Sequence, residues 1–87
     1  MVTENVIDFG QITPNALAEA SRYSIAIHWS PDDDAFLATV PELPGTITHG
    51  DTPAEAAEMA AEAAALWLSA ARYSGRDIPA PRFAVIA

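Results

Sequence analysis

The chain has 87 residues, 51% of them hydrophobic, and it carries twelve acidic side chains but only four arginines and no lysine, for a formal net charge of −8. This length supports one domain with a modest core, and the hydrophobic fraction excludes a disordered chain. The absence of cysteine excludes a disulfide framework and a cysteine-ligated zinc site, and the scarcity of basic residues argues against direct nucleic-acid binding. Since there is no secretory-signal pattern and no apolar run long enough to span a membrane, we expect a cytoplasmic protein.

The first part of the chain predicts one short helix. Residues 1–12 have no clear period, and the sequence leaves open whether they are ordered or flexible. Thr13 and Pro14 fit an N-cap followed by proline at the first helical position. They predict a helix over residues 13–22.

Three strands are predicted next. Residues 23–30 (YSIAIHWS) alternate with period two, and residues 35–40 (AFLATV) are predicted to pair with them across an acidic turn, PDDD. A third strand is predicted over residues 46–50 (TITHG), with Ile47 pointing toward the core. Pro44-Gly45 before it fits the centre of a type II turn. The strands together predict an antiparallel meander.

The best-defined element is a long helix that ends near Ser74. Thr52 and Glu55 form a capping box around a proline at the first helical position, and Gly75 fits the C-terminal cap. Helical periodicity gives a main apolar stripe of Ala56, Met59, Ala63, Trp67 and Ala70, and a second one of Ala57, Ala61, Ala64 and Leu68. The sheet would cover one stripe, and the N-terminal helix or a second copy of the chain would cover the other. Of these we favour a homodimer.

A proline-containing connector then leads to residues 82–87 (RFAVIA), which predict a C-terminal strand. The expected fold of the single domain, residues 1–87, is therefore α+β, in the order α-β-β-β-α-β. It comprises a short N-terminal helix, a three-stranded antiparallel meander, one long helix and a last strand. One face of the sheet would be left for a partner.

No catalytic constellation can be assigned from the sequence. There is no nucleophile elbow and no phosphate-binding glycine loop, and His28 and His49 lack a recognised ligand spacing. We therefore expect no enzyme activity, no metal and no cofactor. Candidate partner-binding residues, chosen for charge and predicted exposure, are Trp29, Asp32, Asp33, Asp34, Glu42, Glu55, Glu58 and Glu62. A core position for the tryptophan, a solvated turn for the aspartates and a solvated helix face for the glutamates are the simpler alternatives.

Residues 23–81 resemble the HicB-like family of antitoxin domains. The resemblance rests on the blocks A-x-V-P-E-L-P-G, T-H-G-D-T-P-x-E-A, W-L-x-x-A and G-x-x-I-P-x-P, which occur in this order. It implies a β-β-β-α-β fold like a truncated ribonuclease-H-like core without its catalytic residues. It also implies dimers or higher oligomers, and a small, basic, mRNA-cleaving HicA-like toxin whose active surface the antitoxin covers.

The sequence departs from the family in two respects. Many members continue into a C-terminal DNA-binding domain, and the chain reaches Ala87 without one, so operator binding is not expected. The residue after Pro-Gly is often cysteine in the family and is Thr46 here. The expected function is an oligomeric antitoxin that neutralises a basic RNA-cleaving toxin by occlusion. The alternatives are an orphan oligomeric regulatory module with no toxin, and a metal-dependent nuclease that would need converging carboxylates.

Overall fold

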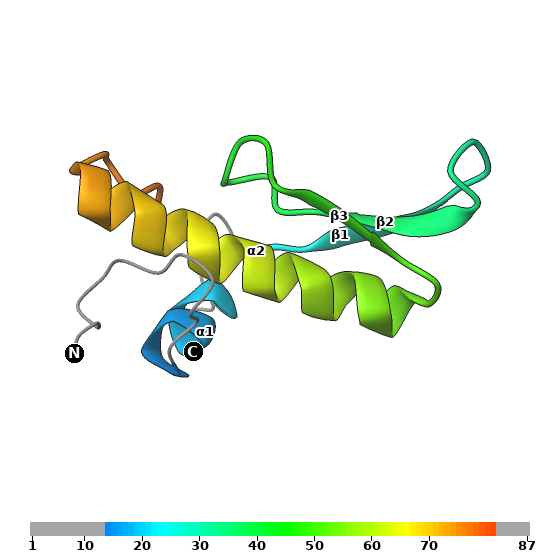
Figure 1. The fold of residues 1–87 in the computed structure, drawn as a ribbon, viewed down its shortest axis with the longest axis horizontal. Helices are drawn as coiled ribbons and strands as arrows, with labels where there is room; N and C mark the ends of the chain where they lie inside the picture. The colour runs from blue at the N-terminus through cyan, green and yellow to red at the C-terminus, as the bar shows by residue number, and fades with distance from the viewer. Residues whose placement is uncertain (1–13, 82–87) are drawn as a thin grey trace, which may run out of the picture.

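A three-stranded antiparallel sheet carries one long helix on one face and a short helix beside it (Figure 1). The structure is a computed structural model that describes residues 14–81. Its elements are α1 (Pro14–Ala20), β1 (Ala26–Ser30), β2 (Ala35–Thr39), β3 (Ile47–Gly50) and α2 (Pro53–Ser74). The expected α+β class, the meander and the long helix are confirmed. The strand expected over residues 82–87, and the question of order over residues 1–12, lie outside the described residues.

The helix α1 and the strand β1 are shorter than expected because the residues between them form other hydrogen bonds. The amide of Tyr23 donates to the carbonyl of Ala20 at 3.0 Å, which closes α1 with a turn. The amide of Ser24 donates to both carboxylate oxygens of Glu42 at 3.2 Å rather than joining the sheet. The ladder between β1 and β2 therefore begins at Ala26, which pairs with Thr39.

The register of the sheet decides which side chains face α2. Ala38 pairs with Thr48, whose hydroxyl donates to the carbonyl of Ala56 in α2 at 3.0 Å, so this row of the sheet faces the helix. Because side chains alternate along a strand, the neighbouring row faces away. Ile47 lies in that neighbouring row and is 62% exposed. The expectation that it points into the core is wrong.

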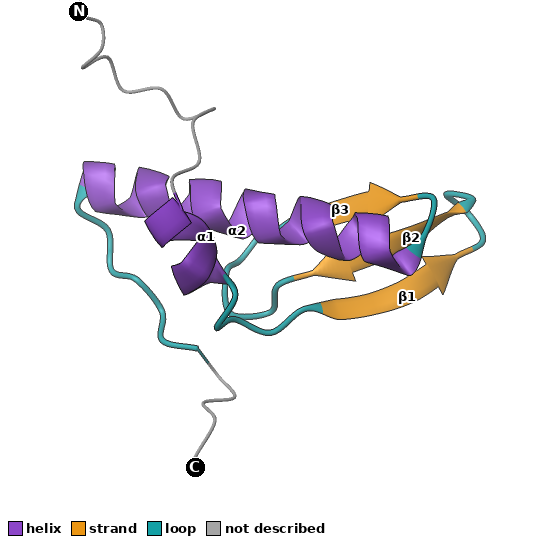
Figure 2. Ribbon diagram, turned by 90° about the horizontal axis from the view of Figure 1, so that it is seen from below, coloured by secondary structure: helices purple, strands orange, loops and turns teal. Residues whose placement is uncertain are grey.

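The helix α2 buries members of both expected stripes, Ala56 of the first and Ala64 and Leu68 of the second, rather than one stripe as a whole. Its buried residues are Ala56, Ala60, Ala64, Ala65, Leu68 and Ala71. Met59, placed in the predicted main stripe, is 45% exposed. The helix packs mainly on β3 and β2, touches β1 least, and has α1 against its flank (Figure 2). The sheet and α1 together therefore cover the alanine side of α2.

Small residues set how closely α2 approaches the sheet. A Cβ atom added at Gly50 would lie 2.7 Å from the backbone nitrogen of Ala56. Real Cβ atoms do not come so close, so only glycine allows β3 and the first turn of α2 to meet in this way. The glycine of the T-H-G-D-T-P block is thus required by packing.

Both predicted caps of α2 are confirmed. The hydroxyl of Thr52 accepts a hydrogen bond from the amide of Glu55 at 3.0 Å. The carboxylate of Glu55 reaches back to the amide of Asp51 at 2.5 Å, one residue earlier than in a standard capping box. At the other end Gly75 adopts φ 76°, and the amide of Arg76 donates to the carbonyl of Ala71 at 2.8 Å.

Candidate interaction surface

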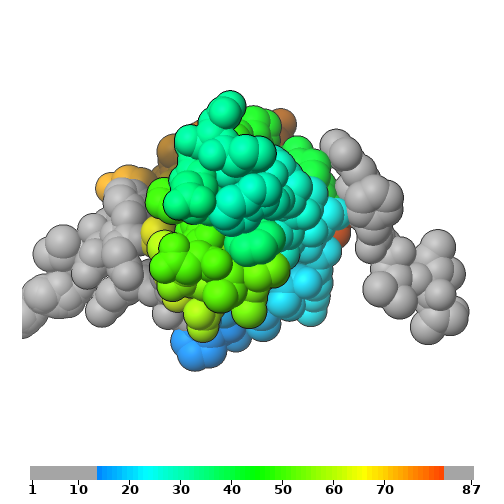
Figure 3. All heavy atoms as spheres, turned by 90° about the vertical axis from the view of Figure 1, so that its right-hand side faces the viewer, coloured from blue at the N-terminus to red at the C-terminus, as the bar shows by residue number. Residues whose placement is uncertain are grey.

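The meander brings two acidic segments to the same end of the molecule. The turn between β1 and β2 lies at this end, and so does the N-terminus of α2, because Gly50 at the end of β3 pairs with Phe36 near the start of β2 (Figure 1). Figure 3 looks directly onto this end. Its exposed carboxylates, which we call the acidic end, belong to Asp32, Asp33, Asp34, Asp51 and Glu55.

The aspartate turn has a defined backbone. The hydroxyl of Ser30 donates to Oδ2 of Asp33 at 2.7 Å, and the amide of Asp33 donates to the carbonyl of Ser30 at 3.2 Å. Asp34 adopts φ 51°, in the left-handed region that favours glycine and that asparagine and aspartate tolerate better than other side chains. The backbone of the turn is therefore defined, and the carboxylate of Asp33 is held by Ser30.

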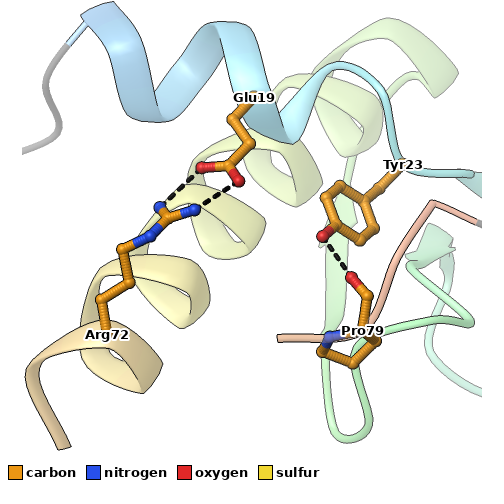
Figure 4. Close-up of polar contacts among 4 residues, drawn as sticks. All are labelled: Glu19, Tyr23, Arg72 and Pro79. Carbon is orange, nitrogen blue, oxygen red and sulfur yellow. Dashed lines mark hydrogen bonds and ion pairs between the residues drawn. The ribbon is translucent and has the colours of Figure 1, made fainter. Parts of the chain in front are cut away.

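Arg72 and Arg76 lie away from the acidic end. Arg72, near the C-terminus of α2, binds Glu19 of α1 through two hydrogen bonds of 2.6 and 2.5 Å (Figure 4). This guanidinium lowers the pKa of the Glu19 carboxyl. The guanidinium of Arg76 lies over the ring of Trp67, with its Cζ atom 5.0 Å from the ring centroid. Over residues 14–81 the pair between Glu19 and Arg72 is the one ion pair, so arginines do not neutralise the acidic end.

An apolar patch lies beside the aspartate turn. Trp29, the penultimate residue of β1, is 47% exposed, and its ring meets that of Phe36 edge to face with centroids 5.0 Å apart. Ile27 shares the same side of β1 and is also exposed. Because α2 lies over β2 and β3, this part of β1 is incompletely covered. Trp29 is thus partly packed against Phe36 and partly exposed.

The remaining predicted glutamates divide into two groups. Glu58 and Glu62 are exposed on α2, beyond Glu55 along the helix. Glu42, expected on the surface, is only 7% exposed. Its carboxylate turns inward because the amide and the hydroxyl of Ser24 both bind it, the hydroxyl at 2.8 Å. The expectation of an exposed Glu42 is corrected, and the residue does not belong to the acidic end.

Two members of this region were not among the predicted site residues. They are Asp51, which precedes the N-cap of α2, and Ile27 in β1. The signal for Asp51 was present in the sequence, since a three-stranded meander returns β3 to the end where the β1–β2 turn lies. No comparable signal marked Ile27, because its exposure depends on where α2 crosses the sheet.

The two histidines lie on one face of the sheet. His28 and His49 flank Leu37 on the sheet face that points away from α2, and both are exposed. Between residues 14 and 81, no group of three or more histidine or acidic side chains is placed to hold a metal ion. No helix of this part of the chain has the length and apolar character needed to cross a membrane.

Fold and surface together define a small acidic α+β protein with exposed carboxylates and a half-exposed tryptophan at one end of the described part of the chain. A family model described as HicB_like antitoxin of bacterial toxin-antitoxin system matches residues 23–85. The chain belongs to this HicB-like antitoxin family, as its sequence blocks indicated. Comparisons with curated proteins and with solved structures gave no match.

Proposed function

We propose that this protein is the antitoxin of a type II toxin–antitoxin pair and neutralises a small, basic, mRNA-cleaving HicA-like toxin by covering its active surface. The observation that carries the proposal is the family match over residues 23–85, which spans the three described strands and α2. In this proposal the chain has no catalytic role, does not contact nucleic acid and works in the cytoplasm as a homo-oligomer. The likeness to a truncated ribonuclease-H-like core belongs to the same proposal.

The docking surface that we propose is the acidic end together with Trp29. An RNA-cleaving toxin must present cationic side chains to the phosphates of its substrate. The same cations would be attracted by carboxylates that are exposed and have no arginine partner within residues 14–81. Glu58 and Glu62 extend this surface along α2. Trp29 supplies the aromatic contact that often dominates the energy of an interface.

The experiment that tests the proposal is co-expression of the tagged chain with the products of the neighbouring reading frames, followed by affinity purification. We expect a short basic protein to co-purify and to dissociate as the salt concentration rises, because charge complementarity steers the pair. Failure of every neighbouring product to bind would overturn the antitoxin proposal. That result would favour the orphan regulatory module.

A further inference from the structure

The indole ring of Trp29 lies on the side of the sheet that carries α2, but the helix does not cover it. Trp29 pairs with Phe36, which pairs with Gly50, and a Cβ atom at Gly50 would meet the backbone of α2. Side chains in one row share a side of the sheet, so all three positions face the helix layer. Phe36 packs against the core, whereas Trp29, in the edge strand, is 47% exposed. The register therefore leaves one large aromatic ring open beside α2.

Acidic residues lie near this ring both along β1 and across the sheet. Asp32 follows Trp29 by three residues, so their Cα atoms are at most about 11 Å apart. Across the sheet, Glu55 lies over Gly50, with its Cβ atom 3.0 Å from the place of a Cβ at the glycine. The one ion pair of residues 14–81 lies at the opposite end of α2. The ring and the carboxylates near it are therefore both open to a partner.

Two arginines of this chain show the contacts that a guanidinium makes. Arg76 lies over the ring of Trp67, and Arg72 forms two hydrogen bonds with the carboxylate of Glu19. A guanidinium is planar, so it can lie flat on an aromatic ring and donate to a carboxylate from its edge at the same time. The ammonium of lysine is a compact charge without this shape. Around Trp29 the ring and the carboxylates are present together, which is the combination that suits arginine.

We propose that Trp29 receives an arginine side chain of the basic partner, with the guanidinium over the indole ring and its N–H groups donating to carboxylates of the aspartate turn. The inference rests on the proposed function, because the toxin is the protein that would supply the arginine. It adds a selectivity that net charge lacks, since net charge attracts lysine and arginine alike. Ile27, exposed on the same side of β1, offers the apolar part of the arginine chain a surface to contact.

The test uses the full chain and two blocked peptides of equal charge, hexa-arginine and hexa-lysine, so that no toxin is needed. The chain has two tryptophans, whose indole N–H signals are separate in a proton–nitrogen NMR spectrum, and the signal lost in Trp29→Leu belongs to Trp29. We expect hexa-arginine to bind about fivefold more tightly than hexa-lysine and to shift the signal of Trp29. Trp67 is the internal control, because Arg76 already lies over its ring, and its signal should move little.

Two variants assign the preference to the ring. Trp29→Leu should bind both peptides equally, and Trp29→Phe should keep part of the preference for arginine because it retains an aromatic ring. The backbone amide signals show that each variant is folded.

Equal binding of the two peptides to the wild type would overturn the proposal, and so would a preference that persists in Trp29→Leu. A Trp29 signal that responds to neither peptide, as expected if residues 82–87 of the same chain cover the ring, would also overturn it. The antitoxin proposal fails by a different result, the lack of any neighbouring gene product that binds the chain.

Discussion

Glu42 and Ser24, eighteen residues apart in the chain, are joined by hydrogen bonds from the amide and the hydroxyl of the serine to the carboxylate of the glutamate. The contact fastens the loop between β2 and β3 to the segment that enters β1. It lies at the opposite end of the sheet from the aspartate turn. The glutamate of the P-E-L-P-G block is therefore a structural residue, although its charge first suggested a partner-binding role.

Replacing Glu42 by alanine should lower the free energy of unfolding by about 2 kcal/mol, because it leaves the partly buried amide of Ser24 without its acceptor. Urea unfolding followed by circular dichroism measures the change. Glu62→Ala, at an exposed position of α2, is the control and should change stability by less than about 0.5 kcal/mol. Equal effects of the two substitutions would show that the contact with Ser24 contributes nothing.

Gly50→Ala should destabilise the protein by about 1–3 kcal/mol, the usual range for overpacking. The added Cβ would meet the backbone of Ala56, which no side-chain rotation relieves. Gly45→Asn makes a useful comparison. Gly45 has φ 84° and open space around its Cα, and asparagine tolerates this conformation. A Gly50→Ala protein as stable as the wild type would mean that β3 and α2 separate at little cost.

The hydroxyl of Tyr23 donates a hydrogen bond to the carbonyl of Pro79, which ties the segment after α2 to the start of the sheet (Figure 4). Burial, the largest cause, raises the pKa of this tyrosine above its ordinary value. A raised folded-state pKa means that the stabilisation is fully present below the unfolded-state pKa, about 10, and is lost as pH rises through the folded-state value. Thermal unfolding between pH 8 and 12 should show this loss.

The pH dependence can be assigned by substitution. Tyr23→Phe should be less stable than the wild type at pH 8 and should lose less stability as pH rises above 10, since the titrating hydroxyl is gone. Tyr73→Phe, which changes the other of the two tyrosines, is the control variant. A Tyr23→Phe protein with the wild-type profile would show that another group causes the loss.

The parts of the fold that depend only on residues close together in the sequence could be predicted. Thr52 and Glu55 mark the start of α2, and Gly75 marks its end, because caps involve only a few consecutive residues. The aspartate turn and the alternation in β1 were predictable for the same reason. Asp51 lies at the same end as the aspartate turn because the three strands form a meander. This part of the acidic end could therefore be predicted from the sequence.

The parts that depend on distant contacts could not be predicted. Alanines surround α2 on nearly every side, so periodicity does not reveal which row the sheet covers; the close approach at Gly50 decides it. Ile47 is the one large apolar residue of a four-residue strand, too little pattern to identify its face. The burial of Glu42 depends on Ser24, which no local pattern links to it.

Neutralising the aspartate turn should slow association with a basic partner more than it weakens the fold. In the variant Asp32→Asn, Asp33→Asn, Asp34→Gly, the last change places glycine where φ is 51° and so should not destabilise the turn. We expect about tenfold slower association at low salt and a weaker salt dependence, measured by stopped-flow fluorescence. Asp77→Asn, exposed just beyond the C-terminus of α2, is the control. If it slows association equally, the acidic end has no special role.

The central claim is tested most directly by messenger RNA cleavage. The purified basic protein from the neighbouring reading frame is assayed while the chain is titrated into the reaction. We predict that cleavage stops when every toxin molecule has one antitoxin chain bound, and that Trp29→Ala requires at least tenfold more protein. Cleavage that continues unchanged in a large excess of the wild-type chain would contradict the assignment of this protein as an antitoxin.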